Sequence, residues 1–236
     1  MILKRYKNFI NEKVDSFLDN LSLEELKEIE SILEVWLQSD NVDFDMSKID
    51  RIFELLKDSK YIVSNGEIFR LMFFDINSIT KDDGHLDINK IKSSIKVDNK
   101  YYSYSKTLAD TMYLYWGWTN FSEFMKKRGN YGIVIKQQIK DGFDVTSFVS
   151  DAYTYITKNH KSEESLLSTF RSAMMLEDSG EDEIISKIDS SYEIEGVITI
   201  DFEKIKDHSN SHKVESYDDF EDEGLFFYKP EDFKLN

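Results

Sequence analysis

The sequence predicts an α+β protein in which a helical amino-terminal region precedes a strand-rich core. Two patterns carry this prediction: apolar residues recur every three or four positions over the first 58 residues, and short β-rich runs begin at Tyr61. The chain also has 17 Phe, 13 Tyr and 3 Trp among 236 residues. This aromatic content indicates a packed core, because disordered acidic chains have few aromatic residues.

The clearest helix signal follows Ser22. Apolar residues with helical spacing form one stripe, which comprises Leu23, Leu26, Ile29, Ile32, Leu33, Trp36 and Leu37. Ser22 stands three residues before Glu25, which is the arrangement of a capping box and predicts that the helix begins there. A second, shorter helix is predicted by the apolar positions Ile49, Ile52, Phe53 and Leu56.

Six β-rich runs follow the helical region. They cover residues 61–63, 68–74, 101–105, 131–139, 183–188 and 194–202, and the dipeptides Asn65-Gly66, Asp83-Gly84 and Asp141-Gly142 supply turn signals. Helical spacing returns in two insertions, 107–127 and 147–175. We therefore expect a helical region at 1–58, a mixed core at 59–207 and an acidic carboxy-terminal tail at 208–236.

Composition excludes several classes of function. The chain has 46 acidic residues against 30 Lys and Arg, so its formal net charge of −16 opposes general binding to nucleic acid or anionic lipid. No run of about 18 apolar residues predicts a membrane span. The absence of cysteine excludes disulfides, a thiolate zinc site and a cysteine nucleophile. His208 and His212 are separated by poor helix formers, so no metal site is expected.

Arg70 is the first residue that points to chemistry. It lies inside the apolar run 67–74, and its guanidinium cannot lose its charge to match those surroundings. A bidentate partner such as a phosphate or a carboxylate would satisfy it. The structural alternative is an ion pair with one of the 46 acidic side chains.

Two further motifs place pairs of polar side chains on one face of a strand. In Ser103-Tyr104-Ser105 the period of two puts both hydroxyls on the same face, although serines before a helix are commonly simple caps. In Glu181-Asp182-Glu183 the same period puts two carboxylates together, where they can serve glycosidic-bond chemistry. An acidic turn is the structural alternative for the second motif.

The order of Arg70, Ser-x-Ser at 103–105 and Glu-x-Glu at 181–183 resembles the signature of mono-ADP-ribosyltransferases of the bacterial toxin and tailed-phage type. The resemblance covers roughly residues 61–202. Two positions depart from the family pattern: Leu71 follows the arginine where glycine is frequent, and Tyr104 stands where threonine is commoner. The resemblance implies an ADP-ribosyltransferase-like core of two small packed β-sheets with flanking helices, preceded by the helical region.

The resemblance also implies a role for each residue. Arg70 would bind a phosphate of NAD, Ser103 would hold the active-site architecture on the nicotinamide-ribose side, and Ser105 would support it. Glu183 would bind a ribose hydroxyl and stabilise the oxocarbenium-like transition state as nicotinamide leaves. Glu181 would orient and deprotonate an acceptor arginine, because a guanidinium is a weak nucleophile until a carboxylate takes its proton.

The expected reaction transfers ADP-ribose from NAD, as substrate, to an accessible arginine of a host protein, without a metal. The charge of −16 fits a basic protein target and disfavours nucleic acid. Phe170 and Arg171 are candidates for recognising that target. The resemblance implies the cytoplasm of a host or target cell, and residues 3–12 resemble segments that direct proteins into tailed-phage heads, with an amphipathic helix as the alternative.

Two other functions stay open. The first is a virion or interaction protein that keeps the fold and binds partners without catalysis, which predicts no NAD binding. The second is an NAD glycohydrolase, which predicts nicotinamide release that is indifferent to added protein.

Overall fold

The computed structural model describes residues 17–38, 46–112, 131–166, 168–170, 183–200 and 224–235. The chain divides into two compact units, and each unit is made from separate parts of the sequence. The first consists of residues 1–63 and 142–180, and the second of residues 64–141 and 181–236. Helices and antiparallel strands are both present, so the predicted α+β class is confirmed, whereas the expected region boundaries at 58 and 207 stay a prediction.

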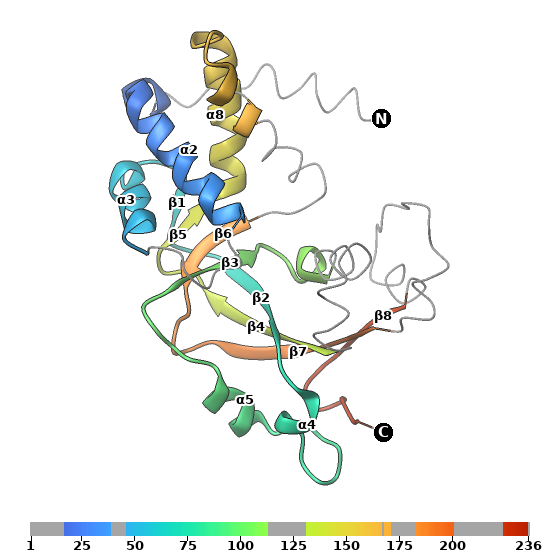
Figure 1. Ribbon diagram of the computed structural model, residues 1–236. Helices are drawn as coiled ribbons and strands as arrows, with labels where there is room; N and C mark the ends of the chain where they lie inside the picture. The colour runs from blue at the N-terminus through green and yellow to red at the C-terminus, as the bar shows by residue number, and fades with distance from the viewer. Residues whose placement is uncertain are drawn as a thin grey trace. The chain divides into compact units, whose positions relative to one another are not determined.

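Most of the helices among the described residues belong to the first unit. They are η1 (Leu18–Asn20), α2 (Leu23–Gln38), α3 (Met46–Leu56) and α8 (Val145–Asn159), as Figure 1 shows. Ser22 caps α2 as expected: Glu25 N donates to Ser22 Oγ at 3.2 Å, and Ser22 N donates to Glu25 Oε2 at 2.8 Å. Asp144 caps α8 by accepting from Ser147 N at 3.0 Å. These caps satisfy N–H groups that the first helical turn leaves unpaired.

Phe148 on α8 organises the aromatic part of this unit's core. Its fully buried ring makes edge contacts with the rings of Tyr61, Phe143 and Phe170, at centroid distances of 5.2, 5.6 and 6.1 Å. Phe170 is 1% exposed, so its expected role in recognising a target is wrong: the ring belongs to the core. Arg171 lies outside the described residues.

The two strands of the first unit are short. β1 (Ile62–Val63) pairs in antiparallel fashion with β5 (Gly142–Asp144). Asp144 N also donates to the Tyr61 carbonyl at 2.9 Å, which extends the pairing by one residue.

Six of the described strands form an antiparallel sheet in the second unit. Their order is β6 (Glu183–Lys187), β3 (Tyr101–Ser105), β2 (Glu67–Phe73), β4 (Tyr131–Gln138), β7 (Glu193–Ile200) and β8 (Leu225–Tyr228). β2 is in register with β4 along its whole length, but with β3 at one pair, Phe69 and Ser105. The sheet is continuous through this pair, so the expected division into two packed sheets is not confirmed.

Each of the six predicted β-runs contains a strand whose ends agree within one or two residues. The sequence patterns miss β5, which has three residues, and β8, which lies in the stretch expected to be an acidic tail. Ile200 and Leu225 are partners in the β7–β8 pairing. Residues 201–223, which lie outside the described part, therefore connect two adjacent strands.

The predicted helical insertions are described in part. Residues 108–112 are helical, and the rest of the first insertion, 113–127, lies outside the described residues. The second insertion contains α8 and helical residues up to 170, and its last five residues are not described.

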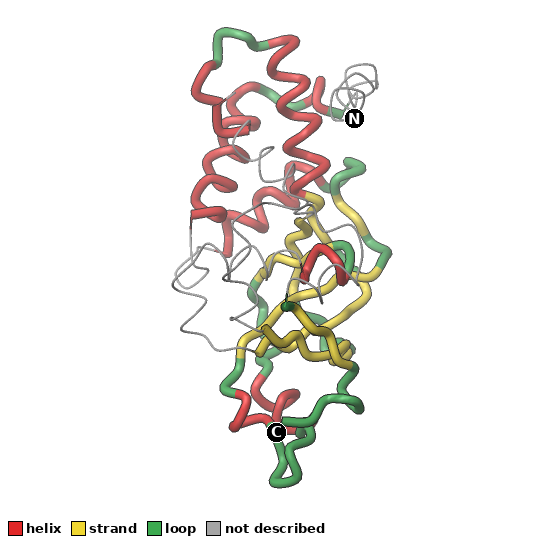
Figure 2. Tube along the Cα trace, turned by 90° about the vertical axis from the view of Figure 1, so that its right-hand side faces the viewer, coloured by secondary structure: helices red, strands yellow, loops and turns green. Residues whose placement is uncertain are grey.

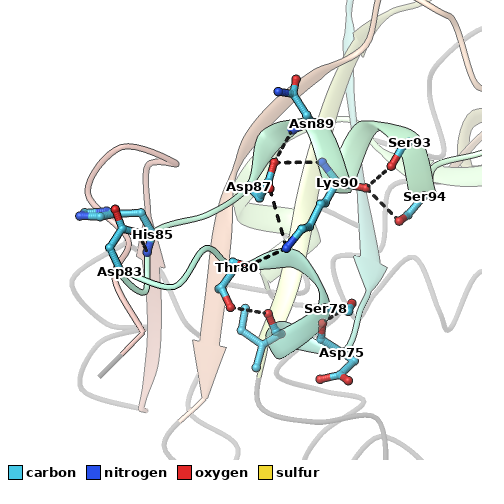
Figure 3. Close-up of polar contacts among 11 residues, drawn as sticks. Asp75, Ser78, Thr80, Asp83, His85, Asp87, Asn89, Lys90, Ser93 and Ser94 are labelled. Carbon is cyan, nitrogen blue, oxygen red and sulfur yellow. Dashed lines mark hydrogen bonds and ion pairs between the residues drawn. The ribbon is translucent and has the colours of Figure 1, made fainter.

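The connection from β2 to β3 contains two short helices that the sequence patterns do not predict, α4 (Ile76–Ile79) and α5 (Ile88–Ser94). Figure 3 shows Lys90 reaching across this connection, where its ammonium donates to the Thr80 carbonyl at 3.2 Å and lies 3.9 Å from Asp87 Oδ2. Asp87 also caps α5 by accepting from the backbone N of Asn89 and Lys90. The lysine charge thus compensates the capping carboxylate.

The carboxy-terminal segment forms hydrogen bonds with the connection between β2 and β3. Leu235 N donates to the Gly84 carbonyl at 2.9 Å, and His85 Nδ1 lies 3.2 Å from the Phe233 carbonyl. Figure 2 shows the carboxy terminus at the end of the second unit that carries these helices. Gly84 has φ of +85°, a conformation that favours glycine, and a side chain there would overlap the Leu235 carbonyl.

A β-bulge in β7 brings that strand close to β8. Val134 pairs with Gly196 and Ile135 with Ile194, so Glu195 is the extra residue. A Cβ at Gly196 would overlap both the ring of Phe227 and the backbone carbonyl of Tyr228. This contact borders a hydrophobic cluster whose fully buried members are Met112, Val134, Ile198 and Leu225.

We expect Gly196→Ala to destabilise the protein by about 1–3 kcal/mol, because the added methyl group meets a backbone carbonyl that cannot rotate away. Urea unfolding of the full chain measures the change. Val97→Ala, at a position 51% exposed, is the control and is expected to change the free energy of unfolding by less than about 0.5 kcal/mol. Equal stability of Gly196→Ala and the native chain would contradict the proposed close approach of β7 and β8.

Candidate functional site

Ser103 and Glu183 meet across neighbouring strands of the second unit. In the β3–β6 register Ser105 is the partner of Glu183, and Ser103 is the partner of Ile185. Directly opposed residues share a face of the sheet, so both serines and Glu183 lie on one face. The Ser103 hydroxyl donates a hydrogen bond to Glu183 Oε1. A carboxylate that accepts this bond is held in one orientation.

Ser105 is the second serine of the motif. It is 3% exposed, and it is also the residue through which β3 pairs with Phe69 of β2. Its position at the junction of three strands, β6, β3 and β2, fits a supporting role for the backbone that carries Ser103.

Arg70 is one residue beyond the single β2–β3 pair. Its Nη1 donates to the backbone carbonyl of Ser103 at 2.8 Å. The guanidinium therefore bridges the two strands at the point where their registered pairing has ended. Ser103 consequently contacts two of the other predicted residues, with its hydroxyl on Glu183 and its carbonyl on Arg70.

Two tyrosine rings flank the Arg70 guanidinium. Its central carbon lies 4.5 Å from the ring centroid of Tyr102 and 5.9 Å from that of Tyr104. Because side chains alternate along a strand, this contact places Arg70 on the face of the two tyrosines, opposite the face of the Ser103 hydroxyl and Glu183. The site is thus built on both sides of the same strand, β3.

The Arg70 guanidinium is incompletely satisfied. Its Nε is shielded from solvent and has no hydrogen-bond partner among the described residues. No carboxylate of the described residues forms an ion pair with it, so the structural alternative raised by the sequence finds no support there. Burial lowers the pKa of Arg70 from its ordinary value, and the neighbouring tyrosines and Glu183 act in the opposite direction.

Hydrogen bonds at their hydroxyls fix both tyrosines. Tyr102 donates to Asp98 Oδ1 at 3.2 Å, and the buried Tyr104 donates to Gln137 Oε1 at 3.4 Å. Burial raises the pKa of both phenols. Neither Tyr102 nor Gln137 belongs to the motifs that predict the site, although the alternation within residues 101–105 places Tyr102 and Tyr104 on one face.

Gln137 is the residue that links Tyr104 to the loop after β6. Its Nε2 donates to the Lys187 carbonyl at 2.8 Å, and its Oε1 accepts from Asp189 N at 2.9 Å. The Asp189 carboxylate pairs with Lys140 and accepts from the Ser191 hydroxyl and backbone N, which lowers its pKa to about 2. This loop is thereby linked through Gln137 to the Tyr104 hydroxyl.

Three of the residues discussed from the sequence lie outside the described part of the chain. Glu181 lies two positions before β6, outside the described residues, as do His208 and His212. Within the described ranges no group of three or more His, Cys, Asp or Glu side chains could hold a metal ion. In the same part of the chain no helix has the length and apolarity needed to cross a membrane.

Comparisons with protein-family models, curated proteins and solved structures give no match for this chain. The chemistry of the site therefore has to be argued from its own residues. The Glu183 carboxylate, which the Ser103 hydroxyl orients, can stabilise a developing positive charge, and a guanidinium whose Nε has no partner among the described residues can bind an anion.

Replacing Asp189 should change how stability depends on pH. Its folded-state pKa of about 2 lies below its ordinary value of 3.8, so its stabilising contribution is present above about pH 4 and is lost as pH falls toward 2. We expect Asp189→Asn to be less stable at pH 7 by on the order of 1–2 kcal/mol, and the difference from the native chain to vanish near pH 2.

Urea unfolding at pH 7, 5, 4, 3 and 2 measures this difference. Asp82→Asn, in an exposed turn, removes one negative charge without these partners and is the control. A gap between Asp189→Asn and native protein that is constant with pH would contradict the assigned role of Asp189.

Proposed function

We propose that the protein is an NAD-dependent mono-ADP-ribosyltransferase that modifies arginine on a target protein. The observation that carries this proposal is the hydrogen bond from the Ser103 hydroxyl to Glu183 Oε1, which joins the serine motif to the second glutamate of the Glu-x-Glu motif. In the family that the sequence resembles, these two motifs form one active site. The pairing of β3 with β2 at the single pair Ser105 and Phe69 would correspond in this proposal to the junction between the two expected sheets.

In the proposed reaction, the bond between nicotinamide nitrogen and ribose C1′ breaks, and its electron pair leaves with nicotinamide. C1′ then carries oxocarbenium character, and the negative charge of Glu183 stabilises it. A guanidinium nitrogen of the target attacks C1′ and forms the new bond. Glu181 takes the proton that this nitrogen loses, since a neutral nitrogen is the better nucleophile.

Arg70 would bind a phosphate of NAD in this proposal. Its unpartnered Nε and the absence of an ion-paired carboxylate among the described residues support an anionic ligand over a structural salt bridge. Ser105 would support the strand that presents Ser103 to Glu183. No metal is required, because the leaving nicotinamide is a neutral group that departs without a Lewis acid.

The proposed target is a basic host protein with an accessible arginine. The net charge of −16 favours encounter with a basic surface and disfavours nucleic acid as the acceptor. The cytoplasm of a host or target cell is the proposed location, with packaging in a phage virion as part of the same proposal. Residues 3–12, which prompt the packaging proposal, lie outside the described residues.

The first test is labelling of proteins in a cell lysate with labelled NAD. We expect Glu183→Gln, which keeps the size and removes the charge, to lower labelling at least about 100-fold, because transition-state charge stabilisation is lost. Glu193→Gln is a matched control, since this glutamate lies on β7 with a side chain that is 73% exposed. Its labelling should equal that of the native chain.

The same assay separates the other functions. Nicotinamide release that is lost in Glu183→Gln but is not raised by lysate proteins would indicate an NAD glycohydrolase. No label, no nicotinamide release and no change in melting temperature with NAD would overturn the proposal and favour a non-catalytic interaction protein.

A further inference from the structure

We infer that Tyr102 and Tyr104 are positioning residues that hold the Arg70 guanidinium in the orientation in which it binds the diphosphate of NAD. This inference deepens the proposed function and rests on it. The serine motif gives no role to either tyrosine. Tyr104 stands at a position where threonine is commoner in the family that the sequence resembles.

The first step concerns the donors that Arg70 has available. Nη1 donates to the Ser103 carbonyl at 2.8 Å, which fixes one corner of the guanidinium. The opposite edge consists of Nε and Nη2, and no described residue supplies an acceptor for Nε, which is shielded from solvent. A buried donor without a partner costs free energy, so an acceptor that arrives with a ligand gains by satisfying it. Two oxygens of one phosphate match this edge.

The second step concerns what keeps the guanidinium in that plane. The ring centroid of Tyr102 lies 4.5 Å from its central carbon and that of Tyr104 lies 5.9 Å away, and both distances are within the range of a cation–π contact. Aromatic faces attract a guanidinium and restrict its tilt. An arginine side chain has four rotatable bonds, so it loses less entropy on binding an anion when its guanidinium is already held in place.

The third step concerns the rigidity of the rings themselves. Tyr102 is held by Asp98, on the segment before β3, and Tyr104 by Gln137 on β4. Gln137 is in turn fixed by the Lys187 carbonyl and Asp189 N. Each ring is therefore fixed by a hydrogen bond to a different part of the second unit.

The experiment measures binding of NAD and of inorganic pyrophosphate to the full chain by calorimetry, together with KM and kcat for labelling. Tyr102 is the better position to vary, because it is partly exposed, whereas Tyr104 is 3% exposed and its replacement can unfold the chain. Tyr102→Leu removes the ring and Tyr102→Phe retains it. Tyr228→Leu, at a tyrosine 37% exposed on β8, is the matched control.

We expect Tyr102→Leu to raise the Kd for NAD and for pyrophosphate by about 2- to 30-fold, as loss of a cation–π contact predicts, and to raise KM with kcat nearly unchanged. Tyr102→Phe, which keeps the ring and loses only the hydrogen bond to Asp98, should bind both ligands more tightly than Tyr102→Leu does. In an Arg70→Lys background, which lacks the planar fork, Tyr102→Leu should have little further effect. A residue with a merely structural role would weaken binding equally in both backgrounds.

The outcomes distinguish this inference from the proposed function. If the native chain binds NAD and Tyr102→Leu binds it equally well, the inference is wrong and the proposed function stands. If the native chain binds pyrophosphate with the expected Tyr102 dependence but does not bind NAD, Arg70 is an anion site as inferred and the proposed function is wrong. If the native chain binds neither ligand, both are overturned.

Discussion

Arg70 keeps its positive charge inside the sheet, because a guanidinium stays protonated in proteins. The described residues give it a backbone carbonyl and two aromatic rings in place of a carboxylate. Much of the surrounding geometry follows from this constraint. The registered pairing of β2 with β3 ends next to Arg70, and the carbonyl that the guanidinium reaches is the one at Ser103.

Ser103 joins two chemically different halves of the candidate site. Its hydroxyl faces Glu183 on one side of β3, while its carbonyl receives Arg70, whose guanidinium lies with the tyrosines of the other side. A ligand that engages both halves would contact a carboxylate and a cation whose spacing one residue sets. A change in the β3 backbone would consequently move the contacts of both the Glu183 carboxylate and the Arg70 guanidinium.

Several parts of this structure follow from the sequence because their signals are local. The capping box of Ser22 and Glu25, the apolar stripe of α2 and the six β-runs each depend on residues within a few positions of one another. The meeting of Arg70, Ser103 and Glu183 is not local, since the three lie on separate strands. It was anticipated only through the order of motifs that a known family shares, and Glu181 lies outside the described residues.

Other parts could not be predicted for physical reasons. β8 follows a strongly acidic stretch, and its four residues acquire their conformation by pairing with β7, whose bulge at Glu195 is a tertiary feature. The buried position of Phe170 depends on Phe148, which belongs to another helical segment. Tyr102 and Tyr104 alternate visibly in the sequence, but their contact with a guanidinium on β2 depends on where the β2–β3 pairing stops.

Because each unit is made from two separate stretches of the sequence, neither unit is complete until its second stretch has been synthesised. Tyr61 emerges from the ribosome well before its ring partner Phe148, because residues 64–141 of the second unit are made between them. At about 5–20 residues per second, the helices of the first unit wait on the order of 4–16 s for the rest of their core. Glu183 in turn reaches Ser103 only after the first unit's sequence is complete. A truncated chain that ends before β6 therefore carries no assembled Ser103–Glu183 pair.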